Sequence, residues 1–366
     1  MQRTGVSQFS SKFGASEFDT GRHWSEPFQT LISEFKLFRS LSLGVSLLTW
    51  ALLSWAGGVT VLKASHQFPG GQGDVRDEMM QLMAREVKAA DVNLDIKIHP
   101  NGSLIKPLEQ WKYLVQGQID MTLLPLDYAS GAHPEFGVTL LPGLVRNHDH
   151  AQRMNQSAFM KDIRTIIQKG GATVLADAWL AGGMGSKDRC LLEPKDAKGL
   201  KVRSAGTHFA KMWAGAGATP LMMPSSEIHA AFQRGSIQAV DTSSGSFVSF
   251  KLNEHIKCLT APGEETLWFM YQPVLISNKA MAQLNEAQRK ALMAAGKKAE
   301  AYFDRESRKL DTTLIETFRQ HNVKIVSLSR TQADQWRAIA RETSYKEFAS
   351  KVPGGQVLIE KALSVQ

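Results

Sequence analysis

The sequence predicts an α/β protein with two lobes, and three observations support this prediction. The chain has 366 residues, a length that favours two domains over one. Hydrophobic residues account for 43% of the chain and charged residues for 21%, which is ordinary for a globular protein. Short apolar stretches alternate with stretches of helical periodicity, as in βαβ units, whose ligand sites lie at the carboxyl ends of the strands.

The first 56 residues are expected to be an N-terminal extension and a signal peptide. Lys36 and Arg39 form a basic segment, and an apolar run over 41–55 follows it and ends in small residues. This pattern is typical of a secretory signal with a small-x-small cleavage site, and the run is short for a membrane-spanning helix. An uncleaved anchor that extends to Leu62 is the alternative. With cleavage, the protein is expected in the periplasm.

Residues 57–178 are predicted to form lobe I, which begins with a strand over 59–64. A turn-rich segment leads from this strand into a helix that Asp74 caps. Strand end, loop and helix start meet there, and α/β proteins place ligands at such junctions. His66 and Gln67 are therefore candidate ligand contacts, with capping of the turn as the alternative. The inward helix face is expected to hold Val75, Met79, Leu82, Met83 and Val87.

The rest of lobe I is expected to continue the alternation of strands and helices. Tyr128 lies in the loop after a buried strand, so it too is a candidate ligand contact. The predicted elements are a strand over 94–99, a helix over 104–116, a strand over 119–124, a helix over 149–169 and a strand over 172–176.

Residues 179–266 are predicted to form lobe II, because glycines cluster at 182–185 and a run of short strands begins there. The expected elements are a strand over 199–203, a helix over 208–213, a strand over 217–223, a helix capped by Ser225 or Ser226, and a strand from Ile237 that runs into a polar loop before Gly245.

Residues 267–366 are predicted to hold the return to lobe I and the C-terminal helices. An apolar strand over 265–277 is expected to lead back to the first lobe. Residues 285–321 have apolar side chains at near-helical spacing and no proline, which predicts one long helix across both lobes.

Arg203 is the most informative single residue, because it ends the strand over 199–203. A guanidinium there presents a rigid fork of donors that fits a planar carboxylate, which a lysine cannot do. An exposed arginine that pairs weakly with solvent is the alternative.

Composition and motifs limit the remaining possibilities. The formal net charge is +8, but basic residues alternate with acidic ones, so we expect no nucleic-acid partner. Ser103 and Lys106 match S-x-x-K without its partner motifs, and His148 and His150 lack a third metal ligand. We therefore expect no enzyme activity, no cofactor and no metal site. In an oxidising compartment, Cys190 and Cys258 favour a disulfide, with two buried thiols as the alternative.

A series of short motifs resembles the signature of the DctP-type substrate-binding proteins of TRAP (tripartite ATP-independent periplasmic) transporters. The resemblance covers roughly 59–345, and each motif alone is weak. The motifs are PNGSL (100–104), VQGQID (115–120), LLPGLV (140–145), DAKGLKVR (196–203), GATP (217–220), MP (223–224) and EIHAAFQRG (227–235).

This resemblance implies a periplasmic-binding-protein-like fold, in which two α/β lobes flank a cleft and a long C-terminal helix spans both. It also implies that Arg203 binds the carboxylate of an organic acid. The expected function is a periplasmic receptor that captures a small organic acid and delivers it to two integral-membrane TRAP subunits. The alternative is a periplasmic sensor or adaptor that presents the acid to a receptor kinase.

The neighbours of Arg203 limit the choice of ligand. The sialic-acid branch of the family carries a second arginine upstream, and residues 181–185 hold none, which disfavours sialic acid. The branch that binds keto acids carries an acidic residue followed by tryptophan at the positions of Asp241 and Thr242. The sequence therefore neither excludes nor supports binding of a keto acid with the help of a metal ion. An aromatic or branched monocarboxylate is expected instead, with core packing or turn capping as the alternative role of each side chain. The further candidate contacts are Trp179, Met184, Thr242, Ser243, Ser244 and Trp268.

Overall fold

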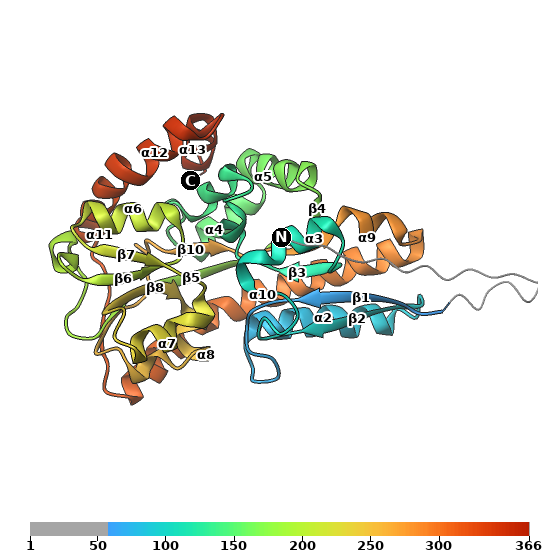
Figure 1. The fold of residues 1–366 in the computed structure, drawn as a ribbon, viewed down its shortest axis with the longest axis horizontal. Coiled ribbons are helices and arrows are strands. Elements are labelled where there is room, and N and C mark those ends of the chain that lie inside the picture. The colour runs from blue at the N-terminus through green and yellow to red at the C-terminus, as the bar shows by residue number, and fades with distance from the viewer. Residues whose placement is uncertain (1–57, 366) are drawn as a thin grey trace, which may run out of the picture. The chain divides into compact units, whose positions relative to one another are not determined.

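Two β-sheets organise the part of the chain that the structure describes, which is residues 58–365 of this computed structural model (Figure 1). The predicted extension and signal peptide over 1–56 lie outside the described residues. Each sheet packs against helices, so the predicted fold of two α/β lobes is confirmed.

The sheet of lobe I joins segments from both ends of the described chain. It consists of β1 (Thr60–Ser65), β2 (Leu94–His99), β3 (Met121–Leu123), β4 (Ala172–Ala176) and β11 (Val274–Ser277), in the order β2-β1-β3-β11-β4. β1 is parallel to β2 and β3, whereas β11 is antiparallel to β3 and β4. Helix α2 (Val75–Ala89) packs its methionines against this sheet, and Asp74 caps it as predicted by accepting a hydrogen bond from the backbone N–H of Arg76.

The helix predicted over 149–169 is in fact two helices. Ser157 starts the second of them, because its hydroxyl accepts a hydrogen bond from the backbone N–H of Met160. The helical segments of lobe I after α2 are η1 (Pro107–Glu109), α3 (Gln110–Gln116), η2 (Leu126–Ala129), η3 (Pro134–Leu140), α4 (His148–Asn155), α5 (Ala158–Lys169) and α9 (Asn278–Gln283).

The sheet of lobe II consists of β5 (Trp179–Ser186), β6 (Lys201–Ser204), β7 (Thr219–Met222), β8 (Ala239–Ser243), β9 (Cys258–Thr260), β10 (Phe269–Tyr271) and β12 (Lys324–Val326). Its order is β12-β9-β5-β8-β6-β7, and β10 pairs with the start of β5. Gly182 in β5 has to be glycine, since an added Cβ would lie 2.1 Å from the carbonyl oxygen of Thr242. A disulfide joins Cys190 to Cys258, whose Cα atoms are 5.1 Å apart.

Two local predictions for lobe II are wrong. The segment after β8 is a helix, because the Ser243 hydroxyl accepts a hydrogen bond from the backbone N–H of Ser246 and starts it. Neither Ser225 nor Ser226 caps the next helix, since a 3₁₀ turn runs directly into it. The helical segments are η4 (Pro194–Ala197), α6 (Thr207–Gly215), η5 (Ser225–Glu227), α7 (Ile228–Gln233), α8 (Ser244–Ser249) and η6 (Leu252–Glu254).

The chain passes between the sheets at neighbouring points. Asp177 and Ala178 carry it from β4 to β5, and Gln272 and Pro273 carry it back from β10 to β11. The backbone N–H of Gln272 donates to the carbonyl of Ala178 over 2.7 Å, so the two crossings lie together. The single strand predicted over 265–277 is therefore wrong, because Pro273 has no N–H to donate and separates two strands that belong to different sheets.

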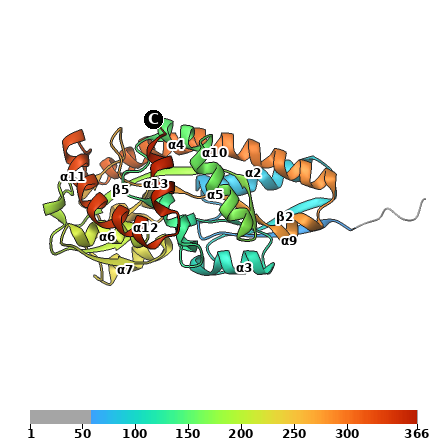
Figure 2. The same cartoon turned by 90° about the horizontal axis from the view of Figure 1, so that it is seen from above.

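Helix α10 (Glu286–Gln320) confirms the long helix predicted over 285–321, and Asn285 caps it. It packs on α2 and β4 of lobe I and on α8 and β12 of lobe II, so it spans both lobes (Figures 1 and 2). The chain then continues through α11 (Arg330–Ala340), the π-helical turn η7 (Arg341–Tyr345), α12 (Lys346–Lys351) and α13 (Gly355–Leu363). Among the described residues, no helix combines the length and hydropathy needed to cross a bilayer.

Candidate functional site

A small cavity lies where the two lobes face each other, and side chains of both form its wall. Its free volume is about 10 Å³, which is room for roughly one water molecule. A solute therefore requires the walls to move apart, as hinge motion of two lobes allows. The wall consists of Phe68, Arg76, Pro125, Tyr128, Arg203, Ala205, Ser225, Thr242, Ser243, Ser246, Trp268, Met270 and Gln272.

Arg203 is buried in this wall, with 1% of its surface exposed. Strand β6 holds it between β7 and β8, and its guanidinium donates to main-chain carbonyls. Nε and Nη2 donate to Met223 over 3.0 and 2.8 Å, and Nη1 donates to Asp241 over 2.6 Å. Nη2 also lies 3.4 Å from the hydroxyl of Tyr128 in lobe I. Carbonyl dipoles only partly compensate a buried cation, so an anion that reaches this point is stabilised.

Asp241 supports the arginine from within lobe II. Its Oδ1 lies 3.7 Å from Nη1 of Arg203 and accepts hydrogen bonds from the backbone of Ala205 and the indole of Trp268, over 2.9 and 3.1 Å. Its Oδ2 accepts from the indole of Trp213 over 2.7 Å. Burial raises the pKa of Asp241, and Arg203 is the largest influence that opposes this rise. The carboxylate thus fixes both the guanidinium and the ring of Trp268 that borders the cavity.

Asp127 is a second buried acid close to Arg203. Burial first, and then the negative charge of Asp241, raise the pKa of Asp127 to about 7. One carboxylate oxygen, Oδ1, has no hydrogen-bond partner, and the side chain packs against Gly206. The charge near Arg203 therefore depends on pH around neutrality, because protonation of Asp127 leaves Asp241 as the acid that balances the arginine.

Arg76 brings a second guanidinium to the cavity, from lobe I. It is 1% exposed and forms an ion pair with Asp74 over 2.6 Å. Its Nη1 donates across the cavity to the hydroxyls of Ser243 and Ser246 in lobe II, over 3.3 and 2.9 Å. Its guanidinium carbon lies 3.8 Å from the ring centre of Phe68, which is cation–π distance. The cavity thus has a basic group on each side.

Five of the predicted ligand contacts meet in the cavity wall: Tyr128, Arg203, Thr242, Ser243 and Trp268. They come from four separate segments of the chain, one in lobe I and three at the sheet of lobe II. Arg203, Thr242 and Ser243 lie on strands, and Tyr128 lies in the turn η2. Trp268 directly precedes β10, and its carbonyl accepts a hydrogen bond from the backbone N–H of Gly182 over 3.0 Å. The arrangement has the features of a binding site and lacks a nucleophile paired with a base.

The other five predicted contacts lie outside the cavity wall. His66 pairs with a buried aspartate of α2 over 3.1 Å, and the buried side-chain amide of Gln67 has no hydrogen-bond partner. The indole of Trp179, at the start of β5, donates to the side chain of Asn155 in lobe I over 2.7 Å. Met184 belongs to the core of lobe II, and the Ser244 hydroxyl donates to an aspartate of α10 over 2.5 Å. His66, Trp179, Met184 and Ser244 are thus engaged in packing or internal hydrogen bonding, whereas the amide of Gln67 is buried without a partner.

Arg76 is the main cavity residue that sequence reasoning missed. A signal for it exists, since Arg76 lies four, seven and eleven residues before Met80, Met83 and Val87, which places it on the buried face of α2. An arginine on an apolar helix face needs a buried partner. Asp74, already identified as the cap, is that partner.

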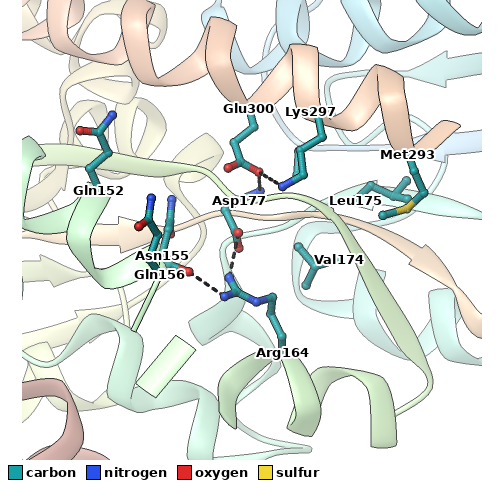
Figure 3. A pocket seen from close by; sticks show the side chains of 11 residues that line it. Gln152, Asn155, Gln156, Arg164, Val174, Leu175, Asp177, Met293, Lys297 and Glu300 are labelled. Atoms are coloured by element: carbon teal, nitrogen blue, oxygen red, sulfur yellow. Dashed lines mark hydrogen bonds and ion pairs between the residues drawn. The ribbon is translucent and has the colours of Figure 1, made fainter. Parts of the chain in front are cut away.

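A roomier hollow of about 510 Å³ lies near the crossings between the sheets, between α4, α5, β4 and α10 (Figure 3). Arg164 points into it and pairs with Asp177 over 2.8 Å, while Lys297 lies 3.8 Å from Glu300 on α10. The Asp177 carboxylate also accepts a hydrogen bond from Tyr271. The smaller cavity has lining residues from both lobes, so we take it as the candidate binding site despite the difference in volume.

Known proteins resemble this chain over most of its length. The family model DctP, described as bacterial extracellular solute-binding protein, family 7, matches residues 71–351. A solute-binding protein of Albidiferax ferrireducens is 35% identical over 307 residues, which is 83% of this chain and 91% of that protein.

Solved structures of TRAP periplasmic solute-binding proteins share the fold. One from Rhodoferax ferrireducens, with bound malonate, is 35% identical with a TM-score of 0.80, and the match covers 83% of this chain and 98% of that one. Another from Sulfurospirillum deleyianum, with bound succinate, is 21% identical with a TM-score of 0.76, and the match covers 84% of this chain and 100% of that one.

Proposed function

The chain belongs to the DctP family of bacterial extracellular solute-binding proteins, and from this premise we propose that it is a periplasmic receptor for a small carboxylate, with Arg203 as the anchor of the carboxylate group. The single observation that supports this assignment best is the buried guanidinium of Arg203 in the wall of the cavity between the lobes. In this proposal the receptor reaches the periplasm through a cleaved signal peptide and delivers its solute to two TRAP membrane subunits.

The contacts across the cavity explain how a solute would be held. The lobes meet through the approach of Arg203 to Tyr128 and through the hydrogen bonds of Arg76 to Ser243 and Ser246. A carboxylate bound at Arg203 would accept hydrogen bonds from both Arg203 and Tyr128, and would so contact both lobes. A ligand that contacts both lobes favours the closed arrangement by its differential affinity for that state.

The second guanidinium changes the expected ligand. Trp268 and Phe68 form an apolar part of the wall, which suits the monocarboxylate with an apolar tail expected from the sequence. Arg76, Ser243 and Ser246 stand on the polar side, where a second acidic group would find donors. We therefore propose a short dicarboxylate, of the size of malonate, as the preferred ligand, with a branched monocarboxylate as the competing outcome.

The proposal is tested by calorimetric titration of protein that has been unfolded and refolded to remove any co-purified solute. Malonate and isobutyrate are compared on the wild type and on Arg203→Lys, which keeps the charge but loses the fork. Arg203→Ala removes one partner of the proposed buried charge pair, which costs about 2–5 kcal/mol, so this variant should lose roughly 30-fold to several thousand-fold in affinity for malonate. Unchanged affinity in Arg203→Lys and in Arg203→Ala would remove Arg203 from the site.

The alternative of a sensory adaptor is not supported by the matched proteins named above. Two of them are TRAP solute-binding proteins. Uptake of labelled malonate by cells that contain the receptor and its membrane subunits, and its loss when the receptor alone is deleted, is the expected result for a transport role. Undiminished uptake in the deletion strain would contradict that role.

A further inference from the structure

A cluster of metal-ligating side chains lies in lobe II, apart from the cavity. One ring nitrogen each from His229 and His255 and one carboxylate oxygen of Glu254 lie within 4.8 Å of one another. None of these three residues belongs to the cavity wall. From this geometry we propose that the cluster is a binding site for a divalent transition-metal ion such as Zn²⁺.

The residue types and their spacing suit such an ion. Imidazole nitrogen and carboxylate oxygen are common zinc ligands at about 2.0–2.2 Å, which puts neighbouring ligand atoms of a tetrahedral site about 3.3–3.5 Å apart. Nε2 of His229 already lies 3.1 Å from Oε2 of Glu254. The centres of the two imidazole rings are 4.6 Å apart, so small side-chain rotations complete a set of three ligands. Water would occupy the remaining position.

An unsatisfied nitrogen is the second observation that points to a ligand. Nε2 of His255 is shielded from solvent and has no hydrogen-bond partner. A buried polar nitrogen without a partner costs free energy, and a bound cation would remove this cost.

The backbone holds the three ligands in place before any ion binds. His229 follows Ile228 at the start of α7, and Glu254 and His255 lie between Leu252 and Ile256. These three flanking apolar residues are fully buried in one hydrophobic cluster of lobe II. The ring of His255 also stacks on Phe232, with centroids 5.5 Å apart and planes 18° apart. Ligands on well-packed segments lose little conformational freedom on binding.

Positive charges near the site limit its expected affinity. The ammonium of Lys187 lies 5.6 Å from the ring centre of Phe232, on which His255 stacks, and Lys251 lies three residues before Glu254. With one carboxylate and two nearby lysines, we expect micromolar rather than nanomolar affinity. The order of preference should follow the general order for nitrogen and oxygen ligands, with Cu²⁺ bound more tightly than Zn²⁺.

The test is calorimetric titration of Zn²⁺ into metal-free protein without a histidine tag, at pH 7.5 in a buffer that does not bind zinc. One equivalent is expected for the wild type. His229→Ala and His255→Ala should each weaken binding by at least about tenfold, since each leaves only two protein ligands. His321→Ala changes an exposed histidine at the end of α10 and should leave binding unchanged. Lowering the pH to 5.5 should also weaken binding, because protonated histidine cannot ligate.

Two controls keep the result interpretable. Melting temperatures in EDTA show whether a variant still folds, and His229 is the safer of the two histidine changes because its side chain is 29% exposed. The carboxylate affinity of the cavity should be the same with Zn²⁺ and with EDTA. No measurable binding to the wild type, or binding that His229→Ala and His321→Ala weaken equally, would overturn the proposal.

Discussion

Replacing Asp127 by asparagine should remove a specific part of the pH dependence of stability. The folded-state pKa of Asp127 is raised to about 7 from an ordinary value of 3.8, chiefly by burial. Between these two pH values the folded protein binds a proton that the unfolded chain has released, so the free energy of unfolding falls as the pH rises. One pKa unit corresponds to about 1.4 kcal/mol, so the loss between pH 4 and pH 8 is about 4 kcal/mol.

The assay is urea denaturation at pH 4, 5, 6, 7 and 8, extrapolated to water, on the wild type and on Asp127→Asn. Asparagine has nearly the same shape and does not ionise, and the contributions of titrating groups that do not interact with Asp127 largely cancel in the difference between the two proteins. The variant is therefore expected to gain about 4 kcal/mol relative to the wild type between pH 4 and pH 8.

A control variant separates this effect from general changes in surface charge. Asp188 is exposed, so Asp188→Asn should show the same pH profile as the wild type. If the free energy of unfolding varies with pH in the same way for Asp127→Asn and the wild type, burial of Asp127 next to Asp241 does not raise its pKa. If the free energy of unfolding falls more steeply with rising pH for the variant than for the wild type, the predicted direction of the effect is wrong.

Three further predictions concern the scaffold. Replacing both Cys190 and Cys258 by serine should lower the free energy of unfolding by about 4 kcal/mol, because the disulfide closes a loop of 68 residues, and an unchanged urea midpoint would contradict this. Gly182→Ala should lower the melting temperature or abolish soluble expression, since the added Cβ would lie 2.1 Å from a main-chain oxygen of β8; a wild-type melting curve would show that the strands can separate. Tyr271→Phe should cost about 1–3 kcal/mol in urea denaturation, because it takes the hydroxyl donor from the buried carboxylate of Asp177, and no loss would show that Arg164 compensates it alone.

Much of the fold could be predicted because local signals and tertiary packing agree. Helix α10 has apolar spacing over its whole length, a capping asparagine and no proline, so its bounds came within a residue of those observed. The strands before Ala178 also agree with the predicted alternation. Arg203 could be placed at a strand end because a polar turn precedes the short apolar stretch.

The features that could not be predicted depend on contacts between distant segments. The break at Pro273 follows from which sheet each half joins, and a single apolar run does not contain that information. Helix α8 begins with serines, which suit turns as well as helix caps. The raised pKa of Asp127 comes from its burial and from the charge of Asp241, which lies more than a hundred residues away in the sequence. Arg76 could have been found from its place on the buried helix face, but its serine partners lie in the other lobe.

The position of a bound carboxylate tests the central claim most directly. The measurement is a crystal structure of the refolded protein, from crystals that are grown with malonate. We predict one carboxylate group of malonate within hydrogen-bonding distance of the Arg203 guanidinium and of the Tyr128 hydroxyl, inside the cavity between the lobes. A structure with malonate bound elsewhere, and with Arg203 still donating only to the carbonyls of Met223 and Asp241, would contradict the account.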